Sequence, residues 1–423
     1  MLFQSPKTDY ALRMHSYAAL LGSQSRISRA ELSAVLPDLV PGPSFDNFFT
    51  FRTSVDIDGH FMKKLGGTIL IARDVIGDSA VTPEDIPSIL STELKSVAKK
   101  KAVFSMRLFG LPHKYTNDLL RVCKKNLKKQ NIPSRYVGTE RIAPKAVQLH
   151  DEGLLESATG CELVVLKDAD NLWIGRTIAA QDVKDYTLKD MSKPVRDTTT
   201  GLLPPKLAQI LLNFGEYLVN EKSHNPNQKP VTSNQKLIYD PFCGTGVILL
   251  EALLKGHPVL GSDIQKKAVT GSEKNIEWLR KTYKVLKKDV PSTVWKQDAL
   301  KPFFMKTPPS VIVTEGSLGP PLHGRPNVKD AEKMIRNAEE LTAAFLLNLK
   351  NTLPGVPVCM TLPVWYSQKK NLMLEKIWGL FDDLGFRPVL PPYADPTVDG
   401  HFSLLYRRPD QFIGREIVML RAK

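Results

Sequence analysis

The chain has 423 residues, of which 42% are hydrophobic and 24% are charged, and its formal net charge is +14. A chain of this length can form two or three domains, and its composition is that of a globular protein rather than of a disordered or fibrous one. The excess of positive charge favours a polyanionic partner, nucleic acid before membrane.

The sequence contains no signal that would take the protein to or across a membrane. No apolar run approaches the length of a membrane span, and the N-terminal stretch M-L-F-Q-S-P-K-T-D-Y lacks the layout of a signal peptide. We therefore expect a cytoplasmic protein without a membrane partner. The four cysteines, at positions 123, 161, 243 and 359, are too far apart in sequence to indicate a zinc site or a disulfide framework. No bound metal is expected.

Both helix and strand patterns occur in the first third of the chain. Ser28 and Glu31 have the spacing of a capping box, which predicts a short helix that Pro37 ends. The run 65–72 predicts a turn that leads into a buried strand, and the run 102–108 predicts another strand. These patterns together predict an α+β region at the N-terminus.

The stretch 117–130 has the periodicity of an amphipathic helix. Four apolar side chains fall on one face, and five basic side chains fall on the other, namely Arg121, Lys124, Lys125, Lys128 and Lys129. Between Lys95 and Lys129 there are eleven Lys and Arg residues and a single acid, Asp118. Such a run is either a solvated face or a surface that contacts phosphate. Because the whole chain is also positive, we favour phosphate contact.

Two apolar segments between Cys161 and Gln181 flank the polar turn 168–171, which predicts a β-hairpin. This hairpin and the basic helix ahead of it resemble the THUMP domain of tRNA-modifying enzymes, an α/β module that holds RNA. The resemblance implies that the region 1–185 binds tRNA.

A distinctive string, R-D-T-T-T-G-L-L-P-P-K-L-A-Q, occupies positions 196–209. Its two prolines prepare a helix N-terminus, and the apolar residues that follow have helical spacing. Taken alone, this is an ordinary packing helix after a linker. The string also resembles the motif that precedes the catalytic core of THUMP-containing tRNA guanine N2-methyltransferases, in which its loop helps to close the cofactor site.

The stretch 237–263 predicts a strand that ends at Asp240, a turn with Gly244 and Gly246, a helix, and a second strand that ends at Asp263. The glycines let backbone N–H groups approach a ligand at the helix N-terminus. The turn lacks the third glycine of a dinucleotide fingerprint and the Gly-Lys-Ser/Thr of a P-loop. An acid on the first strand suits a cationic ligand, and an acid on the second strand suits a ribose diol.

A single G-x-G is also found as a tight turn in other α/β proteins. The whole string D-P-F-C-G-T-G, followed by an apolar helix and G-S-D, resembles motif I and its partner acid in S-adenosylmethionine-dependent RNA methyltransferases. The resemblance implies that S-adenosylmethionine is the cofactor and that it is bound by Asp240, Pro241, Phe242, Cys243, Gly244, Gly246, Asp263, Ile264, Asp298 and Ala299. Asp298 follows a third predicted strand, where it either faces the adenine amine or caps the next element.

Strands and helices continue to alternate up to the C-terminus, where two strands around the turn 408–411 predict an antiparallel hairpin. The chain is therefore predicted to be of the α/β class. An N-terminal α+β region with a THUMP-like module, 1–185, precedes a Rossmann-like class I methyltransferase domain, 186–423. The sheet of that domain is expected to be mostly parallel, with the antiparallel hairpin at its C-terminal end.

The fourth strand of this domain is followed by T-E-G-S-L-G-P-P-L, at 314–322. Amino-methyltransferases of this class carry Asp or Asn, two prolines and an aromatic residue there. The acid or amide and a carbonyl accept hydrogen bonds from the target amine, and the ring stacks on the flipped base. We predict Glu315 and Gly316 as catalytic residues and Leu318 as a substrate contact without the stacking ring.

The predicted activity is methyl transfer to an exocyclic base amine of tRNA, with guanosine N2 favoured. The leading alternative is an RNA-binding protein whose methyltransferase domain binds the cofactor without catalysis. A DNA amino-methyltransferase shares the core chemistry but leaves the THUMP-like region unexplained. The sequence leaves open which nucleotide is modified, and whether the protein acts with a small activating subunit or as a homodimer.

Overall fold

The structure is a computed structural model that describes residues 13–77, 79–97, 101–139, 142–197, 202–222, 235–320, 322, 324–366, 371–397, 400–408 and 411–423. The chain divides into two compact units. Unit 1 comprises Met1–Leu21, Leu36–Lys63 and Thr68–Asp182, and unit 2 comprises Gly22–Val35, Lys64–Gly67 and Val183–Lys423. Residues 1–12 lie outside the described part of the chain, and they include the N-terminal stretch that lacks the layout of a signal peptide.

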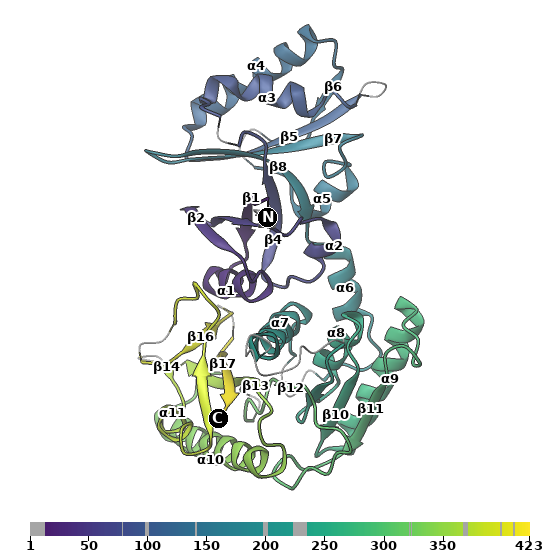
Figure 1. Cartoon of the computed structure of the whole chain (residues 1–423), viewed down its shortest axis with the longest axis vertical. Coiled ribbons are helices and arrows are strands. Elements are labelled where there is room, and N and C mark those ends of the chain that lie inside the picture. Colours follow the sequence, from purple (N-terminus) through teal and green to yellow (C-terminus); the bar gives the residue numbers. More distant parts are fainter. Residues whose placement is uncertain are drawn as a thin grey trace, which may run out of the picture. The chain divides into compact units, whose positions relative to one another are not determined.

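Among the described residues, unit 1 is built on an eight-stranded sheet in the order β2-β3-β1-β4-β8-β7-β5-β6 (Figure 1). Its strands are β1 (His15–Leu21), β2 (Val40–Phe45), β3 (Phe48–Thr53), β4 (Thr68–Asp74), β5 (Ala102–Phe109), β6 (Ser134–Tyr136), β7 (Gly160–Lys167) and β8 (Leu172–Ala180). β5 pairs in parallel with β6 and β7, whereas β7 and β8 are antiparallel. The predicted strands at 65–72 and 102–108 and the predicted hairpin are confirmed as β4, β5 and β7–β8.

Helices cover both faces of this sheet. The helical segments of unit 1 are α2 (Gly59–Met62), the short 3-10 turn η1 (Pro83–Asp85), α3 (Ile86–Glu93), α4 (His113–Lys129) and α5 (Ala146–Asp151). α3 and α4 pack together on one face against β5 and β7 (Figure 1), and α5 packs on the other face. α4 is the predicted amphipathic helix, because its apolar residues at 119, 120, 123 and 127 are buried while all five of its predicted basic contacts are exposed.

The N-terminal helix, α1 (Ser25–Val35), belongs to unit 2, and its predicted capping box is wrong. The helix begins three residues before Ser28, so that Ser28 lies inside it and donates from Oγ to the carbonyl of Gly67 at 2.7 Å. The Glu31 carboxylate accepts from the N–H groups of Gly66 and Gly67 at 2.8 and 2.7 Å. Both side chains are buried and connect α1 to the segment 64–67 instead of capping the helix.

Unit 2 contains a sheet in the order β11-β10-β9-β12-β13-β17-β15, with β14 beside β13 and β16 beside β17. The strands are β9 (Ile238–Asp240), β10 (Val259–Asp263), β11 (Ser292–Lys296), β12 (Val311–Thr314), β13 (Val358–Tyr366), β14 (Asn371–Leu372), β15 (Phe386–Val389), β16 (Ser403–Tyr406) and β17 (Ile413–Ala422). β9 to β13 are parallel, and β17 is antiparallel to β13, β15 and β16. These directions confirm the predicted sheet, which is mostly parallel and has antiparallel strands at its C-terminal end. Two of the residues in the predicted turn 408–411 lie outside the described part of the chain.

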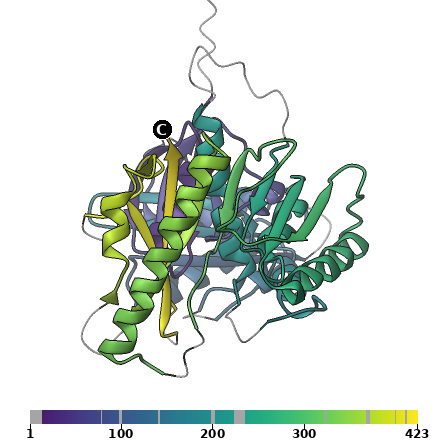
Figure 2. The same cartoon turned by 90° about the horizontal axis from the view of Figure 1, so that it is seen from below.

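The helices of unit 2 are α1, α6 (Val183–Met191), α7 (Pro205–Lys222), α8 (Val247–Leu254), α9 (Lys266–Tyr283), α10 (Val328–Thr352) and α11 (Glu375–Leu380). α7, α8 and α9 contribute to the core on one face of the sheet, and α10 and α11 contribute to the core on the other. Figure 2 shows α10, in light green, lying over the yellow strand β17, with which it shares this core. None of the helices in the described ranges is long and apolar enough to cross a membrane.

Candidate functional site

A cavity of about 500 Å³ lies in unit 2 at the carboxyl ends of β9, β10 and β12. β9 is flanked by β10 on one side and by β12 on the other, so the order of the strands reverses at this point of the sheet. Ligands of open parallel sheets bind at such a switch point. Of the ten residues predicted to bind the cofactor, all except Gly246 line the cavity, as do Glu315, Gly316 and Leu318.

The turn between β9 and α8 depends on its two glycines. Gly244 has φ +51° and Gly246, which precedes the first turn of α8, has φ +87°. A Cβ atom on Gly246 would also lie 2.9 Å from the hydroxyl of Ser272, which itself donates to the carbonyl of Gly244. Residues with side chains rarely adopt this backbone conformation, so the glycines are required for the turn.

Five carboxylates line the cavity, namely Asp197, Asp240, Asp263, Asp298 and Glu315, and no Lys or Arg occurs among its described lining residues. Asp240 is buried, and its Oδ1 accepts from the Thr314 hydroxyl at 2.7 Å and from the N–H of Phe242 at 3.1 Å. Burial, together with the negative charges of Asp263 and Glu315, raises the pKa of Asp240 to about 7. Clustered carboxylates of this kind are stabilised by a bound cation.

The two other predicted acids also hold the loops that form the cavity. Asp263 accepts from the N–H of Gly244 at 3.0 Å through Oδ2 and from that of Gln265 at 2.8 Å through Oδ1. Asp298 accepts from the N–H of Leu300 at 2.9 Å, so it caps the turn that follows β11 and at the same time lines the cavity. Since a carboxylate has about four acceptor positions, each can still accept from a ligand.

The segment after β12 differs from the amino-methyltransferase pattern in its backbone as well as in its sequence. Gly316 and Gly319 have φ +72° and +80°, a conformation that the fixed φ of proline cannot adopt. Glu315 accepts from Nε of Arg415 at 2.5 Å, and its carbonyl accepts from the Thr361 hydroxyl at 2.5 Å. The side chain of Leu318 is 8% exposed. Pro321 lies outside the described residues.

Sequence reasoning did not identify Arg415, Thr361 or Asn275. Asn275 Nδ2 donates to the carbonyls of Val195 and Thr245, at 2.9 and 2.8 Å, which connects the residue just before the string 196–209 to the glycine turn. That string contributes Asp197, Leu202 and Leu203 to the cavity, whereas its residues 198–201 lie outside the described part of the chain. Arg415, Thr361 and Asn275 come close to the site only in the folded structure, and no local sequence pattern indicates them.

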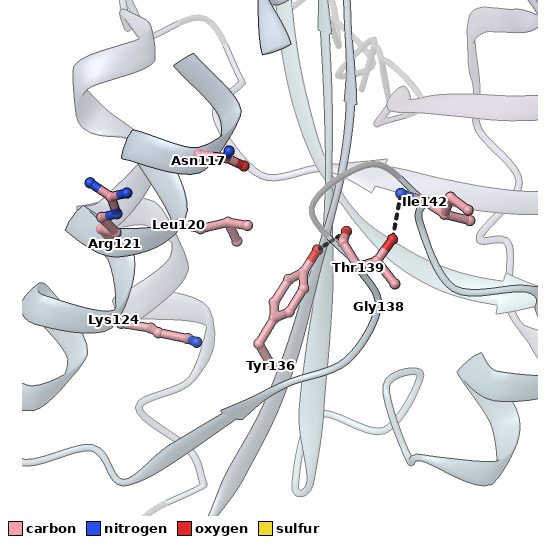
Figure 3. A pocket seen from close by; sticks show the side chains of 8 residues that line it. All are labelled: Asn117, Leu120, Arg121, Lys124, Tyr136, Gly138, Thr139 and Ile142. Carbon is pink, nitrogen blue, oxygen red and sulfur yellow. Dashed lines mark hydrogen bonds between the residues drawn. The ribbon is translucent and has the colours of Figure 1, made fainter. Parts of the chain in front are cut away.

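A second pocket, of about 690 Å³, lies on unit 1 beside α4 (Figure 3). It is lined by Asn117, Leu120, Arg121, Lys124, Tyr136, Gly138, Thr139 and Ile142. The Tyr136 hydroxyl donates to the carbonyl of Thr139 at 3.3 Å, and Lys124 Nζ lies 6.0 Å from the centroid of the Tyr136 ring. Of the five predicted basic contacts, Arg121 and Lys124 line this pocket, and Lys125, Lys128 and Lys129 are exposed elsewhere on α4.

The structure contains no candidate metal centre in the ranges that it describes: no three His, Cys, Asp or Glu side chains there are grouped so that they could hold an ion. All four cysteines are buried, and none of them forms a disulfide bond. Burial raises the pKa of the Cys243 thiol well above its usual value, so the thiol in the glycine turn is a packing group rather than a nucleophile.

No family model matches the chain. Among curated proteins, it is 35% identical over 77 residues, 18% of each chain, to the tRNA (guanine(10)-N2)-dimethyltransferase of Methanothermobacter thermautotrophicus. It is 27% identical over 136 residues, 31% of this chain, to the protein of the same name from Pyrococcus abyssi. The matched stretches span 18% and 34% of these relatives' own lengths.

Several solved structures align along most of the chain. TrmN from Thermus thermophilus is 15% identical, and the alignment covers 97% of this chain and 100% of that one with a TM-score of 0.47. A possible methylase from Clostridium difficile is 12% identical, with 97% and 99% covered and a TM-score of 0.45. The two sequence matches confirm the resemblance that the motifs indicate: the chain is similar, over part of its length, to tRNA guanine N2-methyltransferases.

Proposed function

We propose that the protein is an S-adenosylmethionine-dependent methyltransferase that acts on an exocyclic base amine of tRNA, with guanosine N2 as the favoured target. The observation that carries this proposal is the cavity at the strand-order reversal, which is lined by five carboxylates and by no cationic side chain among its described residues. The similarity to proteins named tRNA (guanine(10)-N2)-dimethyltransferase supports the choice of the amine. In this proposal the protein works in the cytoplasm.

The carboxylates of the cavity fit S-adenosylmethionine. When bound, this cofactor supplies a methyl group on a positively charged sulfur. Asp240 provides negative charge for a cationic ligand, Asp263 provides acceptors for a ribose diol, and Asp298 provides an acceptor for the adenine amine. The same carboxylates would repel the phosphates of a dinucleotide or a nucleoside triphosphate.

Glu315 and Gly316 would orient the target amine. Glu315 uses Oε1 to accept from Arg415, and no described residue occupies its Oε2. Oε2 and the Gly316 carbonyl can therefore accept the two protons of the amine, which directs the nitrogen lone pair toward the methyl carbon. The amine so oriented would take up the methyl group with release of the neutral thioether, and it would then lose one proton to water.

Leu318 offers no ring on which a flipped base can stack. Base–aromatic stacking is worth about 1–3 kcal/mol per base, so its loss slows the reaction by roughly fivefold to 150-fold without removing the chemistry. The exposed lysines and arginine of α4 would hold the RNA through phosphate contacts.

The test uses labelled S-adenosylmethionine, unmodified tRNA and mass spectrometry of the nucleosides. Glu315→Gln is the informative variant, because its amide oxygen can still accept from Arg415 while its NH₂ group cannot accept from the target amine. We expect transfer by the wild type, loss of transfer in Glu315→Gln, and equal cofactor affinity in both. Glu340→Gln, at an exposed position of α10, is the matched control and should remain active.

The alternative function, RNA binding by a non-catalytic domain, is favoured by the altered segment 314–322. It predicts that the wild type and Glu315→Gln bind cofactor and tRNA alike and that neither transfers a methyl group to any unmodified tRNA. That result would overturn the proposed activity.

A further inference from the structure

An ion pair joins two residues that are one hundred positions apart in the sequence. Arg415, on β17, donates from Nε to Oε1 of Glu315, which directly follows β12, at 2.5 Å. The side chains are 3% and 17% exposed, so the pair is largely removed from water. Removal of one partner from a buried pair leaves an uncompensated charge, whereas an exposed pair contributes little.

The main chain of Glu315 is fixed separately from its side chain. The Thr361 hydroxyl donates to the Glu315 carbonyl at 2.5 Å from β13, and Arg415 lies opposite Pro363 of the same strand. Adjacent antiparallel strands therefore supply one contact to the backbone and one to the carboxylate. This leaves Glu315 with few alternative rotamers and with Oε2 unoccupied by any described residue.

The charged groups that face Glu315 have opposite effects on its protonation. Burial raises the pKa of Glu315 above its usual value, and the neighbouring Arg415 guanidinium limits that rise. Among the described residues, Asp240 on β9 also interacts with Glu315, and its negative charge favours the protonated form. Arg415 is thus the described group that opposes protonation of this carboxyl. A protonated Glu315 would carry an O–H donor in place of an acceptor.

We propose that Arg415 is a positioning residue for methyl transfer: it holds one oxygen of Glu315 so that the other remains an ionised acceptor for the target amine. The inference rests on the proposed function. A guanidinium is suited to this role because it is always charged and has a rigid arrangement of donors, so it fixes both the charge and the orientation of the carboxylate.

The experiment measures single-turnover methyl transfer to tRNA as a function of pH for Arg415→Gln and Arg415→Lys. Arg421→Gln, which removes a guanidinium from the same strand, is the control. In Arg415→Gln we expect the rate to fall more than about tenfold near pH 6 and to return to within about threefold of wild type near pH 9, because a higher Glu315 pKa moves the acid limb upward by more than about one pH unit. Arg415→Lys retains the charge and should shift the limb less.

Cofactor affinity, measured by calorimetry, reports whether each variant is folded and should stay within about threefold of wild type, since a change of that size is below 1 kcal/mol. A rate that falls by the same factor at every pH would overturn the proposal, because a purely structural role lowers activity without moving the limb. An unchanged profile would overturn it as well.

A second measurement separates failure of this inference from failure of the proposed function. An NMR titration of labelled glutamate side chains, with the Glu315 signal assigned from Glu315→Gln, needs no substrate. The Glu315 carboxyl should remain ionised at a lower pH in wild type than in Arg415→Lys or Arg415→Gln. Should wild type methylate no RNA while the carboxyl still shifts, the proposed function fails and the electrostatic role stands; an unshifted carboxyl refutes the role of Arg415 in either case.

Discussion

The pocket on unit 1 and the cavity in unit 2 have opposite charge. Arg121 and Lys124 line the first, which has no acid among its described lining residues, whereas five carboxylates line the second. The basic side chains are exposed, and Asp240 is buried. Exposed cations keep their contact with water, so they carry little desolvation cost and are available to a polyanion. Burial of a carboxylate carries a large desolvation cost unless a cation of the ligand compensates the charge. The net charge of +14 therefore agrees with the polyanionic ligand expected at unit 1 but gives no indication of the cationic ligand expected in unit 2.

The largest effect on this difference in charge is expected when Asp240 loses its negative charge. Asp240→Asn retains an oxygen that can accept from Thr314 and Phe242, so the geometry of the turn should survive. We expect S-adenosylmethionine to bind roughly a hundredfold more weakly, about 3 kcal/mol, because a charge-assisted contact in a buried site is lost. Calorimetry checks this, and Asp289→Asn, at an exposed position, is the control. Unchanged affinity in the folded variant would show that Asp240 does not face a cation.

The same substitution should stabilise the free protein. The pKa of Asp240 is raised from 3.8 to about 7, so the folded state binds more protons than the unfolded state over that range, and stability contributed by this group is lost as the pH rises toward 7. Asn does not titrate. The advantage of Asp240→Asn over wild type in the free energy of unfolding should therefore grow by roughly 2–3 kcal/mol between about pH 5 and pH 8.

Denaturant unfolding without cofactor, at several pH values, measures this difference. If the difference in the free energy of unfolding between the variant and wild type does not change with pH, the pKa of Asp240 is not raised and its charge does not destabilise the free protein. The opposite changes in cofactor affinity and in stability distinguish a residue that is retained for binding from one that is retained for folding.

A smaller effect is expected at Asp263. Asp263→Ala removes an acceptor for the ribose and also the carboxylate that holds the N–H of Gly244. Cofactor affinity should fall by about 1–3 kcal/mol, through an unpaired ligand hydroxyl and a looser glycine turn. Asp263→Asn, which can still accept from Gly244, should lose less. If both variants bind the cofactor as tightly as wild type does in calorimetry, Asp263 does not contact it.

The parts of the site that could be predicted from the sequence are those with a local cause. The strand, glycine turn and helix at 238–254 follow from apolar periodicity and from Gly244 and Gly246, both of which have a positive φ in the structure. The amphipathic helix α4 follows from its helical spacing. The capping box at Ser28 and Glu31 has the correct local spacing, but burial against Gly66 and Gly67 determines the structure instead. Tertiary contacts outweighed a local preference there.

The parts that could not be predicted depend on pairs that are distant in sequence. Nothing near Glu315 indicates Arg415, because the contact exists only when β17 lies beside β13. The strand β15 was missed because its four residues, Phe386–Val389, include a proline and have no alternation of buried and exposed positions. Tyr136 was missed because a three-residue strand carries no periodicity.

The smallest effect tests the basic side of the comparison. Lys124 lines the pocket on unit 1 beside Tyr136, so Lys124→Gln removes one charge from a pocket that we expect to contact phosphate. Each phosphate contact changes the slope of log affinity against log salt by about 0.7–0.9, and we expect Lys124→Gln to reduce the slope by roughly that amount and to weaken tRNA binding a few-fold. Lys274→Gln, an exposed lysine of α9, removes the same charge elsewhere. Replacement of Lys124, Lys125, Lys128 and Lys129 together should lower the slope further while leaving cofactor affinity unchanged. If Lys124→Gln and Lys274→Gln lower the slope equally, tRNA senses only the net charge of the chain, and the pocket is not a specific contact.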